Sequence, residues 1–156
     1  MTEYSIRPLP TPDNEREIVI SQRGMTYGET LVFPSGSEFV WCYTALTTLT
    51  LGGCVAIDFT GGAAAGQNPR ATVPATTTVA HMFGMACETI IAAGGIWVQT
   101  KGRAYVAQYT AADTMALAGF LKPANAVQTF SLDHATTATA SAVAIAEEAS
   151  DAAATA

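Results

Sequence analysis

The side chains that most often carry out chemistry are few in this sequence and lie far apart. It has two histidines, His81 and His134, and three cysteines, Cys42, Cys54 and Cys87. A zinc site would need such ligands a few residues apart, as in Cys-x-x-Cys or His-Glu-x-x-His, and neither spacing occurs. We therefore expect structural or surface histidines, buried free thiols of a protein made in a reducing cytoplasm, and no metal or cofactor.

The serine and the carboxylates give no catalytic pattern either. Ser35 lies in Pro34-Ser35-Gly36-Ser37, which lacks the Gly-x-Ser-x-Gly frame of a nucleophile elbow and is typical of a turn. Glycoside hydrolysis would need two close carboxylates, and any protein of this size offers such sets by chance. The acidic residues concerned are Asp58, Glu88, Asp113 and Asp133. We predict that the chain is not an enzyme.

Charge excludes two further classes of protein. Only 13% of the residues are charged, about half the usual share, and the 7 basic residues against 13 acidic ones leave a net charge of −6. A nucleic-acid-binding surface needs clustered Lys and Arg, which are absent. No apolar run approaches the roughly 20 residues of a membrane-spanning helix, and Met1–Tyr4 lacks the basic start of a signal peptide. Small, weakly charged side chains suit a surface covered by neighbours, although a secreted Gly/Ala-rich protein would look similar.

A glycine pattern indicates the elements that carry these residues. An apolar residue, glycine and a short apolar run recur at Leu51–Ile57, Ala93–Val98 and Ala118–Leu121. Glycine supplies the positive φ of a tight turn, and the β-branched and aromatic residues after it favour a strand. Each copy therefore predicts a turn that leads into a strand. Three copies in one short chain predict a compact all-β barrel or sandwich.

Other strands follow from short apolar runs between Gly and Pro signals. We expect them at 18–20, 30–33, 38–43, 76–86 with a kink at Gly84, and 127–132. The clearest hairpin joins 96–100 to 103–109 through Lys101-Gly102. Its alternation places Trp97 and Gln99 on one face and Ile96 and Val98 on the other.

Composition divides the chain into three parts. Residues 1–17 carry Pro8, Pro10 and Pro12 at alternate positions and predict an extended arm, either a disordered terminus or a segment that lies along a partner. Residues 18–132 form the β-domain. Residues 133–156 are rich in Ala and Thr, with a last strand at 143–146; a short helix over 142–152 is the alternative.

Part of the chain resembles the small β-barrel type of tailed-phage capsid decoration (cement) proteins. The resemblance is carried by Phe83–Ala86, Ile91–Gly95, Trp97–Gly102 and Thr114–Pro123, where Gly119-Phe120-Leu121-Lys122-Pro123 matches a Gly-x-Leu-x-Pro-like segment. The segment Ala45–Val55 is similar to the family's opening strand unit. The resemblance covers roughly residues 41–132 and the strand at 143–146. The arm and the strands before residue 40 have no counterpart.

The resemblance implies a structural protein that binds the outside of an assembled phage capsid and bridges its subunits. Its expected partners are the major capsid protein and further copies of itself, as a homotrimer or alternatively a dimer, with no nucleic acid or membrane. We expect the arm to supply the interface, together with a tryptophan that is otherwise a core residue and a basic residue after the hairpin turn. The interface candidates are Arg7, Pro8, Leu9, Pro10, Arg16, Trp97 and Arg103. Alternatives are another virion β-protein (head-fibre base, tail or adaptor component) or a carbohydrate-binding β-domain.

Overall fold

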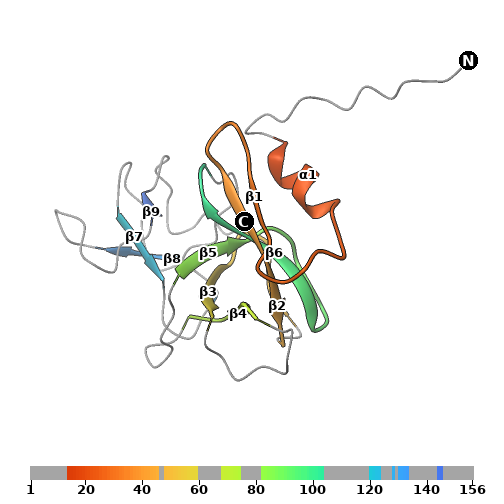
Figure 1. The fold of residues 1–156 in the computed structure, drawn as a ribbon. Coiled ribbons are helices and arrows are strands. Elements are labelled where there is room, and N and C mark those ends of the chain that lie inside the picture. Colours follow the sequence, from red (N-terminus) through yellow and green to blue (C-terminus); the bar gives the residue numbers. More distant parts are fainter. Residues whose placement is uncertain are drawn as a thin grey trace, which may run out of the picture.

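The computed structural model describes residues 14–45, 48–59, 68–74, 82–103, 120–123, 128, 130–133 and 144–145. Within them lie one short helix and nine strands, arranged as an all-β fold (Figure 1). The elements are α1 (Glu15–Ile20), β1 (Thr30–Val32), β2 (Glu38–Thr44), β3 (Cys54–Asp58), β4 (Arg70–Thr72), β5 (Met82–Ala86), β6 (Gly94–Lys101), β7 (Phe120–Pro123), β8 (Phe130–Asp133) and β9 (Ala144–Ile145).

Five of these strands close into a barrel. The sheet runs in the order β1-β2-β4-β3-β5-β6, and β6 returns to pair with β2, so that the barrel is β2-β4-β3-β5-β6 and β1 is an extra strand. The closing pair is the longest: β2 and β6 run antiparallel from Glu38 opposite Lys101 to Thr44 opposite Gly94. Closure leaves the barrel strands without a continuous open edge, which is how small β-proteins avoid unwanted strand pairing.

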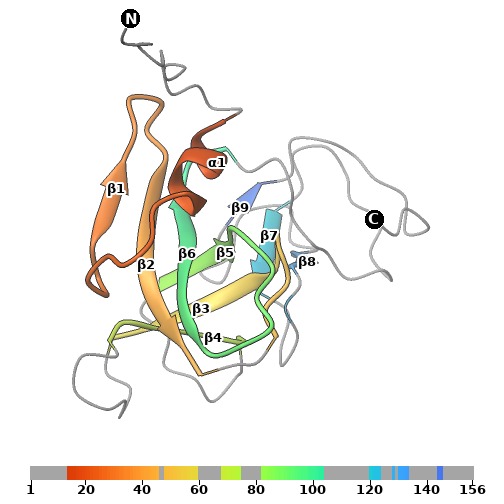
Figure 2. The same cartoon turned by 90° about the vertical axis from the view of Figure 1, so that its right-hand side faces the viewer.

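The other edge of β2 is shared by two partners. Its first half pairs antiparallel with β1, with Leu31 opposite Phe39. Its far end pairs in parallel with β4, where Tyr43 lies opposite Arg70. Because β2 pairs with β1 in its first half and with β4 at its far end, β1 lies beside the barrel and is not part of it (Figure 2).

Alternate residues of β2 and β6 face two different apolar clusters. The inner cluster fills the barrel and consists of Val40, Cys42, Leu49, Val55, Ile57, Ala71, Ala86, Ile96 and Val98. The outer cluster consists of Val19, Phe39, Trp41, Cys87 and Trp97, with Ile20, Met25, Tyr27, Leu31 and Phe33 packed against it. The predicted alternation at residues 96–99 is therefore confirmed, with Ile96 and Val98 inside the barrel and Trp97 outside.

Helix α1 covers the outer cluster and corrects one sequence prediction. Residues 18–20 were expected to form a strand, but they lie in a helix that starts at Glu15. Glu15 and Val19 are four residues apart and are both buried, which places them on one helix face against the sheet. Two acidic residues in the first turn suit the positive end of the helix dipole. Packing against the aromatic cluster outweighs the strand preference of Ile and Val in so short a run.

The three copies of the glycine pattern have different outcomes. In the first copy Gly52 has φ +77° and leads into β3, as predicted. In the second, Gly94 and Gly95 already belong to β6, so the predicted turn there is wrong. Any Cβ on Gly95 would overlap the Trp41 indole ring, so close packing explains this glycine. In the third, Phe120 and Leu121 begin β7, whereas Ala118 and Gly119 lie outside the described residues.

The predicted hairpin is wrong in its pairing, although Gly102 has the expected backbone conformation. Gly102 has φ +98°, as the turn requires. However, β6 pairs with β2 on one edge and with β5 on the other, where Met85 lies opposite Gln99 and Ala86 opposite Val98. Both edges of β6 are thus occupied at Val98 and Gln99, and 104–109 lie outside the described residues. Gly84, where a kink was expected, lies within β5 opposite Val55 of β3, and a Cβ there would lie 2.6 Å from the Gln99 carbonyl oxygen, so close packing explains this glycine.

A second sheet of three strands has the order β8-β7-β9. It contains the predicted last strand, observed at Ala144–Ile145, so a strand rather than a helix forms there. Gln128, which precedes β8, bonds to the barrel: its Oε1 accepts from Thr50 N–H (2.8 Å) and its Nε2 donates to the Thr48 carbonyl (2.9 Å). Its own carbonyl accepts from Cys54 N–H at 3.1 Å. The side-chain amide thereby acts as a short strand partner for residues 48–50.

These elements change the predicted limits of the arm and the tail. The arm was expected to be extended to residue 17, but residues 15–17 are the first turn of α1, and residues 1–13 lie outside the described residues. The boundary at 132/133 falls within β8, and β9 from the predicted tail pairs with β7. The C-terminal segment therefore contributes to the fold at Asp133 and at Ala144–Ile145.

Candidate functional site

The three cysteines are buried free thiols, as predicted. Burial raises the pKa of Cys54 to about 12, and it does the same for Cys42, with a smaller contribution from the neighbouring Cys87. Cys87 also has a pKa of about 12, again because of burial. A thiol reacts as its thiolate, so these side chains are inert at neutral pH. Both histidines lie outside the described residues.

Two of the acidic residues singled out in the sequence, Glu88 and Asp58, have structural surroundings. Both oxygens of Glu88 accept hydrogen bonds from the Arg23 guanidinium, with Nη1 to Oε1 at 2.8 Å and Nη2 to Oε2 at 2.5 Å. This pair joins the loop after α1 to the loop after β5. Asp58 ends β3 opposite Arg70 of β4. Within the described ranges, no three His, Cys, Asp or Glu side chains gather where they could hold a metal ion.

The serine pair at the β1–β2 turn also has a structural environment. Gly36 has φ +90°, which confirms the predicted turn. Ser35 Oγ lies 2.8 Å from Oε2 of the buried Glu15 and 3.0 Å from Ser37 Oγ. It also accepts from Ser37 N–H at 3.1 Å. This network fastens the start of α1 to the turn, and it satisfies a carboxylate that would otherwise be costly to bury.

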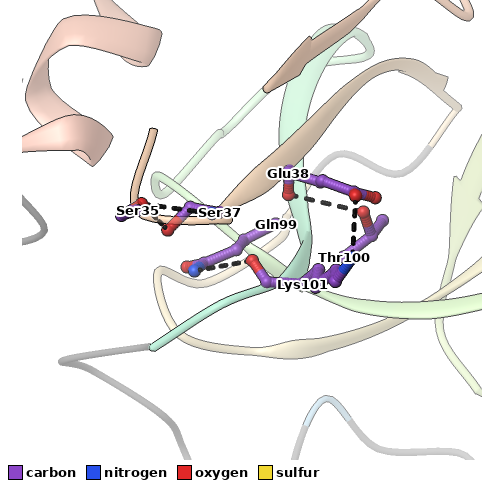
Figure 3. Close-up of polar contacts among 6 residues, drawn as sticks. All are labelled: Ser35, Ser37, Glu38, Gln99, Thr100 and Lys101. Carbon is purple, nitrogen blue, oxygen red and sulfur yellow. Dashed lines mark hydrogen bonds and ion pairs between the residues drawn. The ribbon is translucent and has the colours of Figure 1, made fainter. Parts of the chain in front are cut away.

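Polar contacts continue from this turn to the end of β6 (Figure 3). The pairing of β2 with β6 is irregular between Glu38 and Phe39, so Thr100 has no residue opposite it. Its Oγ1 donates to the Glu38 carbonyl at 3.3 Å. Lys101 Nζ lies 3.1 Å from Glu38 Oε1, and Gln99 Nε2 donates to the Lys101 carbonyl at 3.2 Å. These contacts fix a β-bulge.

Two further features of the described surface bear on partner binding. Exposed large apolar side chains occur at Val32 (65% exposed), Ile91 (85%), Phe59 and Met82. The second feature is the outer edge of β1, since β1 ends the six-stranded sheet and has β2 as its strand partner. Val32 belongs to both features. An unpaired strand edge beside an exposed apolar side chain can accept another strand.

Of the seven predicted interface residues, the structure describes Arg16, Trp97 and Arg103. Arg7, Pro8, Leu9 and Pro10 lie outside the described residues. Arg16 lies on α1 and pairs with Glu17 at 2.6 Å, and this hydrogen bond lowers the pKa of the Glu17 carboxyl.

Trp97 must be reassigned, and Arg103 stays at the surface. The Trp97 side chain is 0% exposed, and its ring centroid lies 5.1 Å from that of Trp41 with the two rings tilted by 53°. Its Nε1 donates to the Gln22 carbonyl at 2.8 Å. With no exposed area it cannot contact a partner, so it belongs to the core. Arg103 is exposed, and its carbonyl accepts from Gln99 Nε2 at 2.9 Å.

The β1 edge was not among the predicted interface residues. Its sequence signal is weak, because Thr30-Leu31-Val32 is a short run before Pro34. A strand can be predicted there, but not that it would be the terminal one, since strand order depends on pairing between distant segments.

Comparison of the chain with protein families, with curated proteins and with solved structures finds no match. In the part of the chain that the structure describes, no helix has the length and apolar character needed to cross a membrane.

Proposed function

We propose that this protein is a structural virion component that binds the outside of an assembled phage capsid and stabilises it by bridging capsid subunits. The observation that carries the proposal is a closed barrel with one added strand, β1, whose outer edge and exposed Val32 are available to a partner. The sequence resemblance over residues 41–132 supports the same role. The partners are the major capsid protein and further copies of this chain, assembled as a homotrimer, with a dimer as the alternative.

The physical basis of such a role is mass action. A protein that binds the assembled shell and not its separate subunits stabilises the shell by the free energy of that binding. Contacts repeated by symmetry add avidity, so that no single contact has to be strong. The small, weakly charged side chains of this sequence are cheap to desolvate, which favours many modest contacts.

A binding experiment on particles tests the proposal. Purified protein is mixed with assembled heads of its own phage that lack it, and separately with the dissociated capsid protein. We expect it to cosediment with the heads alone and to raise the temperature at which they release DNA. Failure to bind either form would refute the proposal. Binding at the portal or tail, seen by electron microscopy, would instead favour another virion β-protein.

A matched pair of variants tests the role of the β1 surface. Val32→Asp places a charge beside the open edge of β1. Ile91→Asp places a charge in the loop between β5 and β6. Both side chains are mainly exposed, so neither change should disturb folding. We expect Val32→Asp to weaken head binding at least tenfold and Ile91→Asp to leave it unchanged. Equal effects of the two variants would contradict a specific role for β1.

The described residues do not favour the carbohydrate-binding alternative, although Tyr27 and Tyr43 are partly exposed. A sugar-binding groove needs exposed Trp or Tyr rings. Trp41 is 5% exposed and Trp97 is fully buried. Tyr27 packs against Trp41 and Tyr43, with ring centroids 6.3 and 5.7 Å apart.

A further inference from the structure

The outer edge of β1 presents a defined set of backbone groups. Trp41 N–H donates to the Glu29 carbonyl, and Phe33 N–H donates to the Ser37 carbonyl, each at 2.9 Å. Alternate residues of an antiparallel strand bond to the same neighbour. The odd-numbered residues 29, 31 and 33 therefore face β2, and the N–H and C=O groups of Thr30 and Val32 face outward.

Nothing in the described part of the chain covers these outward groups. Thr30 and Val32 are both exposed, whereas Leu31 between them packs against the outer cluster. The Thr30 hydroxyl donates a hydrogen bond to the Gly28 carbonyl at 3.5 Å, which does not involve the outward backbone groups. The edge therefore offers two donors and two acceptors in an extended conformation.

The sequence of the N-terminal arm contains a complementary, one-sided set of donors. Successive N–H groups of an extended chain point to opposite sides, and proline has no N–H. With proline at 8, 10 and 12, one side of an extended segment lacks donors, and those of Leu9, Thr11 and Asp13 all lie on the other side. Such a segment can add to one sheet edge and then ends the sheet, because its outer side cannot donate to a further strand.

The geometry at the start of α1 decides which copy supplies the segment. The bond between Glu15 and Ser35 places the beginning of the helix at the turn end of β1. A chain's own residues 7–13, leading directly into that helix, would run parallel to its own β1. The arm of a second copy is free to pair antiparallel, which is the more stable arrangement per residue. Thirteen residues reach up to about 40 Å, enough to cross to a neighbour.

We infer that residues 7–13 of one copy add as an antiparallel strand to the outer edge of β1 in a neighbouring copy. The backbone of Leu9 and Thr11 pairs with that of Thr30 and Val32. Reciprocal exchange gives a dimer, and cyclic exchange closes a trimer. The inference adds a contact between copies to the proposed function, and it is tested without any capsid.

Proline substitutions in the arm test the one-sided pairing. Leu9→Pro/Thr11→Pro removes the donors that face β1, whereas Pro8→Ala/Pro10→Ala restores donors on the opposite side. Both variants leave the described fold untouched. Sedimentation velocity of the full chain should show at least a tenfold loss of self-association in the first variant and none in the second. Wild-type association of Leu9→Pro/Thr11→Pro would overturn the inference.

Cross-linking then identifies the copy that supplies the arm. One sample carries Leu9→Cys, a second carries Thr30→Cys, and the two are mixed with a short thiol-specific cross-linker. The native cysteines are fully buried and do not compete. We expect a band of doubled mass from the mixture. A cross-link found only within single chains of the Leu9→Cys/Thr30→Cys variant, or no cross-link at all, would overturn the inference. A positive cross-link with no head binding would refute the proposed function alone.

Discussion

The two apolar clusters on either side of β2 and β6 are built from different side chains. The inner cluster contains aliphatic residues, two alanines and a cysteine, whereas the outer cluster centres on Phe39, Trp41 and Trp97. A barrel of five strands encloses little space, so small and medium side chains fill it. Among the described residues, the outer cluster is covered by the six-residue helix α1, by β1 and by the loops on either side of β1. Large aromatic rings supply the buried area that these short elements cannot.

This difference indicates that the two clusters protect different parts of the fold. The inner cluster holds the barrel strands together, and its loss should unfold the molecule as a whole. The outer cluster holds α1 and β1 against the barrel, and thereby the open edge proposed to bind partners. Four measurements test this division.

Alkaline pH should have the largest effect, because it acts on both clusters. The three thiols have pKa values near 9 when unfolded and about 12 when folded, so the folded state keeps protons that the unfolded state loses. Their stabilising effect is complete below pH 9 and is lost as the pH rises toward 12. Three such groups remove about 4 kcal/mol of stability per pH unit in this window.

Urea unfolding at pH 8 to 11 measures this loss, and two single variants apportion it. Cys42→Ala removes the inner thiol and Cys87→Ala the outer one, and each should flatten the pH dependence by about one third. An unchanged slope in both variants would show that other groups cause the alkaline loss.

Trp97→Ala should have the next largest effect, about 3–5 kcal/mol for a buried aromatic side chain. It removes the ring against Trp41 and the hydrogen bond to the Gln22 carbonyl. Hydrogen exchange should show α1 losing protection before the barrel. Ile57→Ala, in the inner cluster, should cost about 2–4 kcal/mol and lower protection of the strands together. Identical hydrogen-exchange patterns in Trp97→Ala and Ile57→Ala would contradict the separate roles of the two clusters.

Gly95→Ala should cost about 1–3 kcal/mol, because the added methyl meets the Trp41 ring. Gly94→Ala is the matched control, since a Cβ at Gly94 has no atom within 4 Å. Thermal unfolding of the two variants measures the difference. If Gly94→Ala were as damaging as Gly95→Ala, the explanation by contact with Trp41 would be wrong.

Arg23→Ala should have the smallest effect, within about 1 kcal/mol, because exposed ion pairs are weak and screened by salt. Arg23 is 54% exposed, although its pairing with Glu88 is bidentate. The difference from wild type should shrink as NaCl is raised in urea unfolding. A large effect independent of salt would assign this pair a role in holding the two loops.

The sequence predicted local features better than distant ones. The alternation at residues 96–99, the turns at Gly36 and Gly52 and the positive φ of Gly102 follow from local rules and are confirmed. The helix at Glu15–Ile20 was missed, since its stability comes from aromatic residues far along the chain. The pairing of β6 with β2 was missed for the same reason: it joins residues 50 to 63 positions apart, which no local pattern encodes.

The candidate site shows the same limit. Trp97 was a candidate anchor by residue type, but its burial depends on α1 and on Trp41 in β2. The open edge of β1 depends on the order of all six strands. Residue type alone predicts which side chains suit an interface, and only the fold decides which of them reach the surface.

The position of Gln128 has a consequence for how the protein is made. Every barrel strand lies between residues 38 and 101, so an interval of translation separates the last barrel residue from Gln128. During that interval the N–H groups of Thr50 and Cys54 and the carbonyl of Thr48 lack their later partner. The nascent barrel is therefore finished by a residue translated after it, and a chain terminated early would leave this side of the barrel open.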